Sequence, residues 1–174
     1  MAPNILHRSL TPADLPLVDK LNATVFGPGC FARTAFRVRE GAPALSAYCR
    51  AAFLNERVIA AVRFTRITIG GTGGALLLGP LAVDPEFAGR GHGRQLIADA
   101  LETAKSDGMR LVVLVGDVPY YGRFGFRPVA PGRITMPGPV DPARLLAAEL
   151  VPGAGDDYAG LIVAERDDQA RKQR

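Results

Sequence analysis

Apolar residues recur with two different spacings in the N-terminal third of the chain. Residues 5–10 fit a short strand. The Thr11-Pro12 pair that follows is typical of a helix start, and apolar side chains then recur every three to four residues up to Val25. A second, weaker helical pattern covers residues 31–39. This third of the chain therefore predicts one strand followed by two helices.

The next stretch is richer in strand patterns. Residues 45–54 and 57–69 predict two antiparallel strands joined by a short turn, and the glycine cluster at 70–74 predicts a loop. The apolar run 75–83 predicts a buried strand. Because Pro80 has no N–H to donate to a neighbouring strand, we expect a bulge or a release of pairing at this point.

A glycine-rich loop and a helix follow this buried strand. The loop contains Gly89, Gly91 and Gly93, and residues 95–104 carry one apolar helical face. The continuous aliphatic run at 110–115 predicts a strand that is covered on both faces. A strand, a helix and a second strand in this order predict a parallel pair joined by a right-handed crossover.

The last third of the chain carries shorter patterns. They predict a helical turn at residues 119–123 and three strands at residues 125–130, 145–150 and 161–164. The whole chain is therefore expected to be a mixed α/β protein. We expect its folded domain to occupy residues 1–165, and residues 166–174, which mix charges of both signs, to form a polar tail.

Composition narrows the class of protein. A chain of 174 residues with 48% apolar and 22% charged side chains fits one globular domain. The net charge of +4 suggests an anionic partner, but the basic residues are scattered, whereas a nucleic-acid surface normally gathers them in a patch. We therefore expect no nucleic acid as partner. The sequence shows no signal peptide and no apolar stretch near the ~20 residues of a membrane span, which predicts a cytoplasmic protein without a membrane partner.

Metal and cysteine chemistry find little support. Cys30, Cys49, His7 and His92 are too few and too far apart in the sequence to indicate a metal cluster, so we expect no metal. Cys49 lies within an apolar run, where inert packing is expected. The sequence contains no Gly-x-Ser-x-Gly nucleophile motif.

The glycine loop at the start of the predicted helix is the strongest chemical signal. Gly89, Gly91 and Gly93 bring unhindered backbone N–H groups to the positive end of a helix dipole, which favours an anion. The dinucleotide pattern Gly-x-Gly-x-x-Gly is not matched, because Arg94 takes its last position when the count begins at Gly89. The glycines at 70–74 lack the Lys-Ser/Thr pair of a P-loop.

Two motifs resemble one known family. The run LAVDPEFAGRGHGRQL, residues 81–96, resembles the acetyl-CoA signature of the GCN5-related N-acetyltransferase (GNAT) superfamily, in which Arg/Gln-x-x-Gly-x-Gly/Ala follows a strand. The run YYGRFGF, residues 120–126, resembles the tyrosine-then-Gly-Phe ending of that superfamily, most like its YhbS-like subgroup. The resemblance covers about residues 45–130. Ala88 stands where the family has Arg or Gln, so a side-chain contact is missing there.

The resemblance implies a fold and a ligand. The fold is a single domain with a central, mostly antiparallel sheet, helices on both faces, and one parallel strand-helix-strand unit whose two strands splay apart. In this family the gap between them admits the pantetheine arm of acetyl-CoA. The implied cofactor-binding residues are Leu81, Ala82, Val83, Ala88, Gly89, Arg90, Gly91, His92, Gly93, Arg94 and Tyr121.

The resemblance also implies a reaction, the transfer of an acetyl or other acyl group from acetyl-CoA to a primary amine of a small molecule or peptide by direct attack in a ternary complex. Tyr121 matches the family's general acid, and a phenol with a pKa near ~10 is protonated at neutral pH. Its neighbour Tyr120 is able to exchange roles with it. The base stays open among Asp117, the tentative choice, Glu40 and Glu56.

Other interpretations remain at this stage. A catalytically silent acyl-CoA-binding or sensing module is the alternative, motivated by Ala88 and the unassigned base. Several arginines either flank the acceptor site, where they would suit a carboxylate or phosphate, or form a solvated face: Arg37, Arg39, Arg63 and Arg66. Both a monomer and a homodimer are compatible with the sequence.

Overall fold

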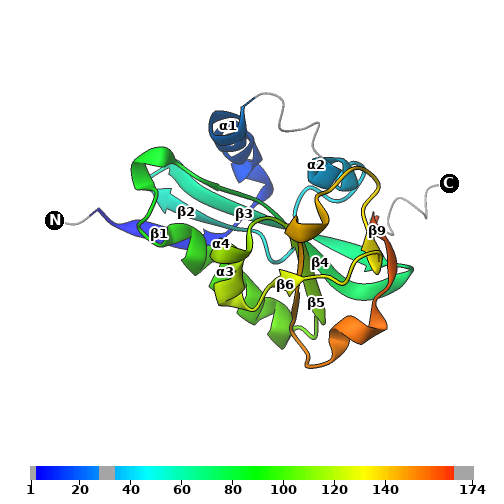
Figure 1. The fold of residues 1–174 in the computed structure, drawn as a ribbon. Coiled ribbons are helices and arrows are strands. Elements are labelled where there is room, and N and C mark those ends of the chain that lie inside the picture. The colour runs from blue at the N-terminus through cyan, green and yellow to red at the C-terminus, as the bar shows by residue number, and fades with distance from the viewer. Residues whose placement is uncertain (1–2, 28–33, 167–174) are drawn as a thin grey trace.

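The computed structural model describes residues 3–27 and 34–166. The strands in this part of the chain are β1 (Ile5–Ser9), β2 (Arg50–Leu54), β3 (Arg57–Ile69), β4 (Thr72–Val83), β5 (Leu111–Val115), β6 (Arg127–Pro128), β7 (Ile134–Thr135), β8 (Leu145–Glu149) and β9 (Gly160–Ala164). The α-helices are α1 (Leu15–Phe26), α2 (Thr34–Val38), α3 (His92–Ser106) and α4 (Val118–Tyr121). The predicted mixed α/β class is confirmed (Figure 1).

The strands form one sheet in the order β1-β2-β3-β4-β5-β8-β6, and β9 pairs with both β3 and β7. Neighbours along the main order are antiparallel except β4 and β5, which are parallel and joined through α3. The predicted strand-helix-strand unit is therefore confirmed. The long strand β3 pairs with β2 along its first half and with β9 at its end.

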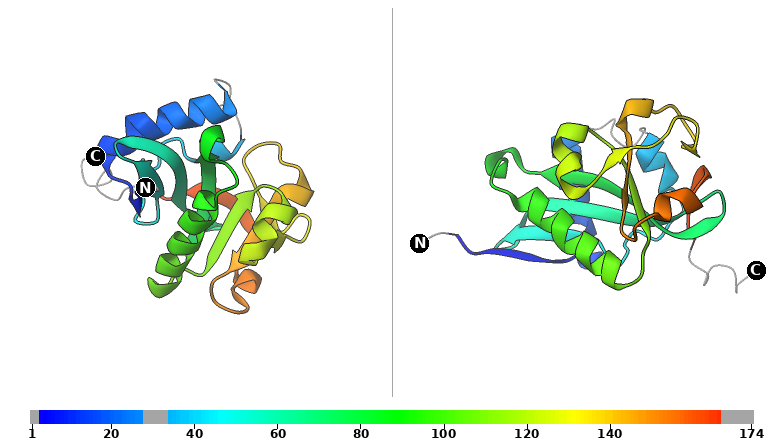
Figure 2. Two further views of the ribbon diagram at one scale, coloured as in Figure 1. Left: turned by 90° about the vertical axis from the view of Figure 1, so that its left-hand side faces the viewer. Right: turned by 60° about the horizontal axis from the view of Figure 1, so that its bottom comes forward.

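Helices cover both faces of the sheet. The buried side chains of α3 pack on one face with those of β3, β4 and β5, as the apolar spacing predicts, and they include Leu96, Ile97 and Ala100. Val18 and Leu21 of α1 pack on the other face. Figure 2 shows α1 and α3 on opposite sides of the sheet. Where β4 and β5 are paired, the face opposite α3 is covered instead by Val38, Ile134 and Tyr158.

The pairing of β4 with β5 ends halfway along β4. The last matched residues are Leu77 and Val113, although β4 continues to Val83. On the opposite edge of β4 the register with β3 shifts where Gly79 and Pro80 stand opposite a single β3 residue, which is a β-bulge. The release of pairing expected at Pro80 is confirmed, and it leaves the second half of β4 separated from β5.

Two predicted boundaries in the first half were wrong. The predicted strand 45–54 begins only at Arg50, because Ser46 and Cys49 close a turn in which the Cys49 N–H donates to the Ser46 carbonyl at 3.3 Å. The predicted loop 70–74 shrinks to Gly70 and Gly71, whose φ angles of +57° and +86° suit a two-residue hairpin turn. The remaining glycines of the cluster belong to β4.

Other boundaries differ by a few residues. The predicted helix 31–39 is observed as α2, and residues 31–33 lie outside the described residues, as does Cys30. The predicted strand 125–130 is reduced to β6, and β7 was not predicted, because a two-residue strand has no periodicity to detect. Apart from Arg166, the expected tail 166–174 also lies outside the described residues.

Candidate active site

The glycine loop joins the end of β4 to α3. Gly89 and Gly91 have φ angles of +76° and +86°, a conformation that favours glycine, and a Cβ at either position would meet no atom within 4 Å. The Gln95 N–H donates to the Gly91 carbonyl at 3.0 Å. The N–H groups of residues 92–94 precede that bond and therefore have no acceptor within the helix. Together with the helix dipole they make a site for an anion.

Ionic contacts hold the loop in front of the helix. The Asp84 carboxylate accepts a hydrogen bond from the Glu86 N–H at 3.0 Å and another from the Arg57 guanidinium, and these contacts lower the pKa of Asp84. Arg57 also pairs with Glu86 at 3.1 Å. The guanidinium groups of Arg57 and Arg90 lie over the Phe87 ring, 5.5 and 5.3 Å from its centre. These contacts connect the approach to the helix with β3.

The first turn of α3 lies close against β4 and α4. A Cβ on Gly93 would lie 3.1 Å from the Tyr120 hydroxyl oxygen and 3.3 Å from a methyl group of Val83. A cavity of about 270 Å³ opens beside this turn. It is lined by Leu81, Val83, Phe87, Ala88, Gly89, Gly91, His92, Gly93, Arg94 and Tyr120. Most of the expected cofactor-binding residues therefore meet at one cavity.

Three of the expected residues lie elsewhere. The side chain of Ala82 is buried with α1 on the opposite face, so only its backbone faces the gap. Arg90 lies over Phe87 and is not among the lining residues of the cavity. Tyr121 lines a larger cleft between β4 and β5.

His92 lines the cavity, but its ring also contacts β1. The His92 Nδ1 lies 3.1 Å from the His7 Nε2, which is hydrogen-bonding distance. Burial, and then the neighbouring His7 and Arg90, lower the pKa of His92, so its ring is neutral at pH 7. Its expected contribution to anion binding therefore comes from the backbone N–H.

A cleft of about 820 Å³ opens where β4 separates from β5. Its lining comes from α1, α2, both strands, α4 and the segment before β8: Phe26, Phe36, Arg37, Arg39, Leu78, Gly79, Pro80, Leu81, Val115, Gly116, Asp117, Tyr120, Tyr121, Pro139, Val140, Asp141 and Arg144. Leu81 and Tyr120 line both this cleft and the cavity beside α3. The two spaces are therefore adjacent.

Tyr121 lies on the wall of the cleft with its ring against Gly116. A Cβ on Gly116 would lie 2.5 Å from the Tyr121 Cε2 atom, so only glycine permits this ring position. The Tyr120 and Phe126 rings meet Tyr121 edge to face at 4.8 and 6.0 Å between centres. Burial, followed by the nearby Tyr120 and Asp117, raises the pKa of Tyr121 to about 12.

The structure separates the candidate bases. Asp117 lies at the rim of the cleft, where its carboxylate accepts a hydrogen bond from the Arg144 Nε at 3.1 Å. Glu40 and Glu56 are exposed and are not among the lining residues. Sequence reasoning missed Asp141, which lines the cleft and caps a short 3₁₀ helix through the Ala143 N–H at 3.0 Å. Its signal was an Asp-Pro pair like the one that follows β4.

The four arginines singled out from the sequence do not all lie in the cleft. Arg37 and Arg39 line the cleft. Arg63 pairs with Asp19 at 3.7 Å and donates to a backbone carbonyl. Arg66 pairs with Glu165 at 3.1 Å. Only the pair on and just after α2 is therefore placed to meet a molecule in the cleft.

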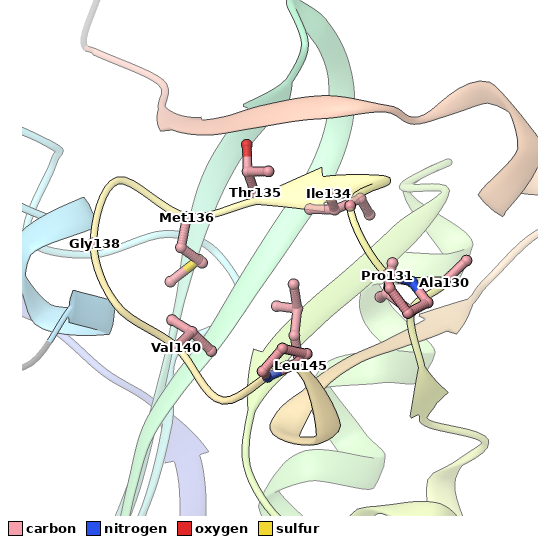
Figure 3. A pocket seen from close by; sticks show the side chains of 11 residues that line it. Ala130, Pro131, Ile134, Thr135, Met136, Gly138, Val140 and Leu145 are labelled. Atoms are coloured by element: carbon pink, nitrogen blue, oxygen red, sulfur yellow. The ribbon is translucent and has the colours of Figure 1, made fainter.

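A further pocket of about 250 Å³ lies between β7 and the start of β8 (Figure 3). Its labelled side chains are mainly aliphatic, and none of its lining residues is ionisable. This pocket offers no group for acid-base chemistry.

Among the described residues no three His, Cys, Asp or Glu side chains are grouped to hold a metal ion. No described helix is long and apolar enough to cross a membrane. Cys49 is buried, with its sulfur 3.4 Å from the Phe64 nitrogen, as expected for a packing residue.

Comparison with known proteins identifies relatives over most of the chain. The profile of the Acetyltransferase (GNAT) family matches residues 18–126. The uncharacterized N-acetyltransferase YhbS of Escherichia coli is 28% identical over 159 residues, which is 91% of this chain and 95% of YhbS. The crystal structure of E. coli YhbS with CoA covers 95% of this chain and 92% of its own, with a TM-score of 0.80. A GNAT acetyltransferase of Brucella melitensis in complex with acetyl-CoA is 26% identical, with a TM-score of 0.62 and coverage of 87% and 98%.

Proposed function

This chain belongs to the acetyltransferase (GNAT) family, and on that premise we propose that it transfers the acetyl group of acetyl-CoA directly to a primary amine of a small molecule or peptide. The observation that carries the proposal is the junction of the two spaces described above. An anion site at the start of α3 opens, past Leu81 and Tyr120, into a cleft that holds a protonated phenol.

The fit to CoA rests on three features of this chain. The glycine loop and the free N–H groups of residues 92–94 suit the pyrophosphate of CoA, since they need no cationic side chain at Ala88. The second half of β4 has no pairing with β5, so its backbone groups are free to bind the amides of a pantetheine arm as a strand would. The proposed cofactor-binding residues are those of the expected set that line the cavity beside α3, together with the backbone of Ala82. Arg90 lies over Phe87, and Tyr121 faces the reacting end of the cofactor from the adjoining cleft.

The proposed reaction joins the two halves of the site. The amine nitrogen forms a bond to the carbonyl carbon of the thioester, the carbon-sulfur bond breaks, and the thiolate leaves with a proton. Backbone N–H groups between Leu81 and Val83 stabilise the negative charge that develops on the carbonyl oxygen. Acetylated amine and CoA are the products, so no further reactant is needed.

Two residues are proposed to move protons. Tyr121 donates its hydroxyl proton to the leaving thiolate, for which its raised pKa suits it because the phenol stays protonated over the whole neutral range. Asp117 is the proposed base or relay that takes the proton of the amine at the rim of the cleft. Tyr120, whose hydroxyl lies near the start of α3, lines the passage between the two spaces.

The proposal is tested by binding and turnover measured on the same protein. We expect calorimetry to show acetyl-CoA binding, and a panel of primary amines to release free thiol from acetyl-CoA. If calorimetry at high micromolar acetyl-CoA shows no heat of binding, the proposal is overturned. Binding without thiol release by any amine supports the alternative, an acyl-CoA-binding module without catalysis, which the Ala88 substitution of the signature motivates. Turnover that is lost in Tyr121→Phe rules out that alternative.

A further inference from the structure

Arg39 differs from the other arginines that line or surround the cleft. Its Nε and Nη1 atoms are buried and have no hydrogen-bond partner among the described residues. By contrast, other guanidinium groups of the chain meet carboxylates: Arg8 meets Asp14, Arg57 meets Asp84, Arg110 meets Asp157 and Arg144 meets Asp117. The ring of Phe36, 5.1 Å from the Arg39 guanidinium carbon, packs against it without neutralising it.

A buried charge without a partner is costly, and the titration of Arg39 reflects this. Burial, and after it the nearby Arg63, lower the pKa of Arg39 to about 9, and Cys49 acts in the opposite direction. The side chain is still a cation at pH 7. A buried polar group without a partner in a folded protein needs an explanation. An anion that enters the cleft would supply the partner that Arg39 lacks.

The position of Arg39 limits the size of that anion's carrier. Its Nη2 atom lies 3.1 Å from the point where a Cβ on Gly79 would lie, which is where β4 leaves β5. Leu81, at the proposed reaction point, follows two residues later, about 7 Å along the strand. An acceptor whose anionic group binds Arg39 while its nitrogen reaches the thioester is therefore small, with only a few bonds between the anionic group and the nitrogen.

The opposite wall and rim of the cleft carry the remaining polar groups. They are the hydroxyls of Tyr120 and Tyr121, the carboxylates of Asp117 and Asp141, and the guanidinium groups of Arg37 and Arg144. Arg144 is already paired with Asp117, and Arg37 is exposed. Arg39, whose Nε and Nη1 atoms are buried without a hydrogen-bond partner, carries one positive charge. That charge balances the single negative charge of a carboxylate, whereas a phosphate with a charge of about −1.5 to −2 at pH 7 stays partly uncompensated.

We propose that the acceptor is a small amine that also carries a carboxylate a few bonds from the reacting nitrogen, as an amino acid does, and that Arg39 binds this carboxylate through two of its N–H groups. The proposal rests on the acetyltransferase function proposed above and names the class of its acceptor. Arg39 acts in binding, and the proton transfers remain with Tyr121 and the base.

The first test compares acceptors with and without the carboxylate charge. Because an amide also lowers the pKa of the neighbouring amine, kcat/KM is calculated for the concentration of neutral amine. Free amino acids and the matching amino acid amides are offered with acetyl-CoA, and thiol release is followed. We expect kcat/KM to favour the acids by about 10- to 100-fold, through KM, because a hydrogen bond to a charged group is lost in the amide. Arg39→Gln is expected to lower kcat/KM for the acids to about the value for the amides, which removes the preference. Compared with Arg39→Gln, Arg39→Lys is expected to keep part of the preference for acids, because lysine carries the positive charge but lacks the parallel N–H groups of a guanidinium.

A matched control isolates the site from net charge. Arg127 is exposed on β6 and lies outside the lining of the cleft, so Arg127→Gln removes the same charge and is expected to keep the preference for acids. Equal kcat/KM for acids and amides in the wild type overturns the proposal. A preference that survives in Arg39→Gln, or a stronger preference for phosphoethanolamine than for amino acids, overturns it as well.

The second test does not depend on turnover. Because Arg39→Met removes an unpaired buried charge, we expect it to raise Tm by about 2 to 4 °C, whereas Arg127→Met leaves Tm unchanged. Sodium propionate, compared with sodium chloride at equal ionic strength, is expected to raise Tm of the wild type and of the Arg127→Met variant but not of the Arg39→Met variant. If no amine is acetylated at all, the proposed function fails, and this measurement still decides whether Arg39 binds a carboxylate. An identical response of all three proteins overturns the proposal.

Discussion

The glycine loop and the cleft are two neighbouring halves of one site, but they are built in different ways. The loop comes from one continuous stretch, residues 81–96, whose two acidic residues next to β4, Asp84 and Glu86, are paired with Arg57 of β3. The cleft gathers α1, α2, both splayed strands and the segment before β8, and it keeps Arg39 without a partner among the described residues. From this difference we expect the loop to be ordered before its proposed ligand binds, and the cleft to gain its missing charge partner only with the proposed acceptor.

The largest expected effect separates the two halves by chemistry. Tyr121→Phe removes the proposed proton donor of the cleft and is expected to lower kcat about 10²- to 10⁴-fold, while the Kd of acetyl-CoA changes less than threefold. Steady-state kinetics and calorimetry on the same preparation check this. Tyr120→Phe is the matched variant, with an expected loss below tenfold. A larger loss in Tyr120→Phe than in Tyr121→Phe would transfer the acid role to Tyr120.

A smaller effect is expected when the Tyr121 ring is moved but kept. Gly116→Ala places a methyl group 2.5 Å from the Tyr121 Cε2 atom, so the ring must shift. We expect kcat to fall about 10- to 100-fold, because a displacement near 1 Å misplaces the donor, with CoA affinity unchanged. At Gly122 a Cβ would lie 3.7 Å from Val118, an ordinary contact, so Gly122→Ala is the control and keeps its activity. Normal kcat in Gly116→Ala contradicts this account.

The loop is tested by two glycines with nearly the same backbone. Gly91 and Gly108 have φ angles of +86° and +85°, and a Cβ on either would meet no atom within 4 Å. Each change to Ala is expected to lower the free energy of unfolding by about 1 to 2 kcal/mol. Only Gly91 lines the cavity beside α3, so only Gly91→Ala weakens CoA binding, by about tenfold. Equal CoA affinity of the two variants, measured by calorimetry, would remove the loop from the binding site.

The smallest expected change concerns pH. A general acid works while it is protonated, and because the pKa of Tyr121 is raised to about 12, its protonated form persists well above the ordinary value of 10. We therefore expect kcat, corrected for nonenzymatic thioester hydrolysis, to stay level between pH 9 and about 10.5. An alkaline fall centred at or below pH 10 would contradict the burial of the catalytic phenol.

The sequence predicted the centre of the fold better than its edges. The Pro80 anomaly predicted a bulge or a release of pairing in β4, because a proline has no N–H to donate to a neighbouring strand. The resemblance to the family implied that the released neighbour is β5. The strand expected from residue 45 failed because the side chain of Ser46 and the sulfur of Cys49 support a local turn, which apolar periodicity does not reveal. Short strands such as β7 exist only because a partner, here β9, lies beside them.

The sequence by itself determined the mixed fold class, the glycine loop at the start of α3 and the resemblance to the family, because each depends on residues that are close together in the chain. Only the tertiary structure decided which charged residues reach the cleft. It left Glu40 and Glu56 outside, placed Asp141 at the rim, and buried Arg39 without an acid. Whether a charged side chain is paired depends on which distant segments of the chain pack against it in the fold. A local sequence pattern does not contain that information.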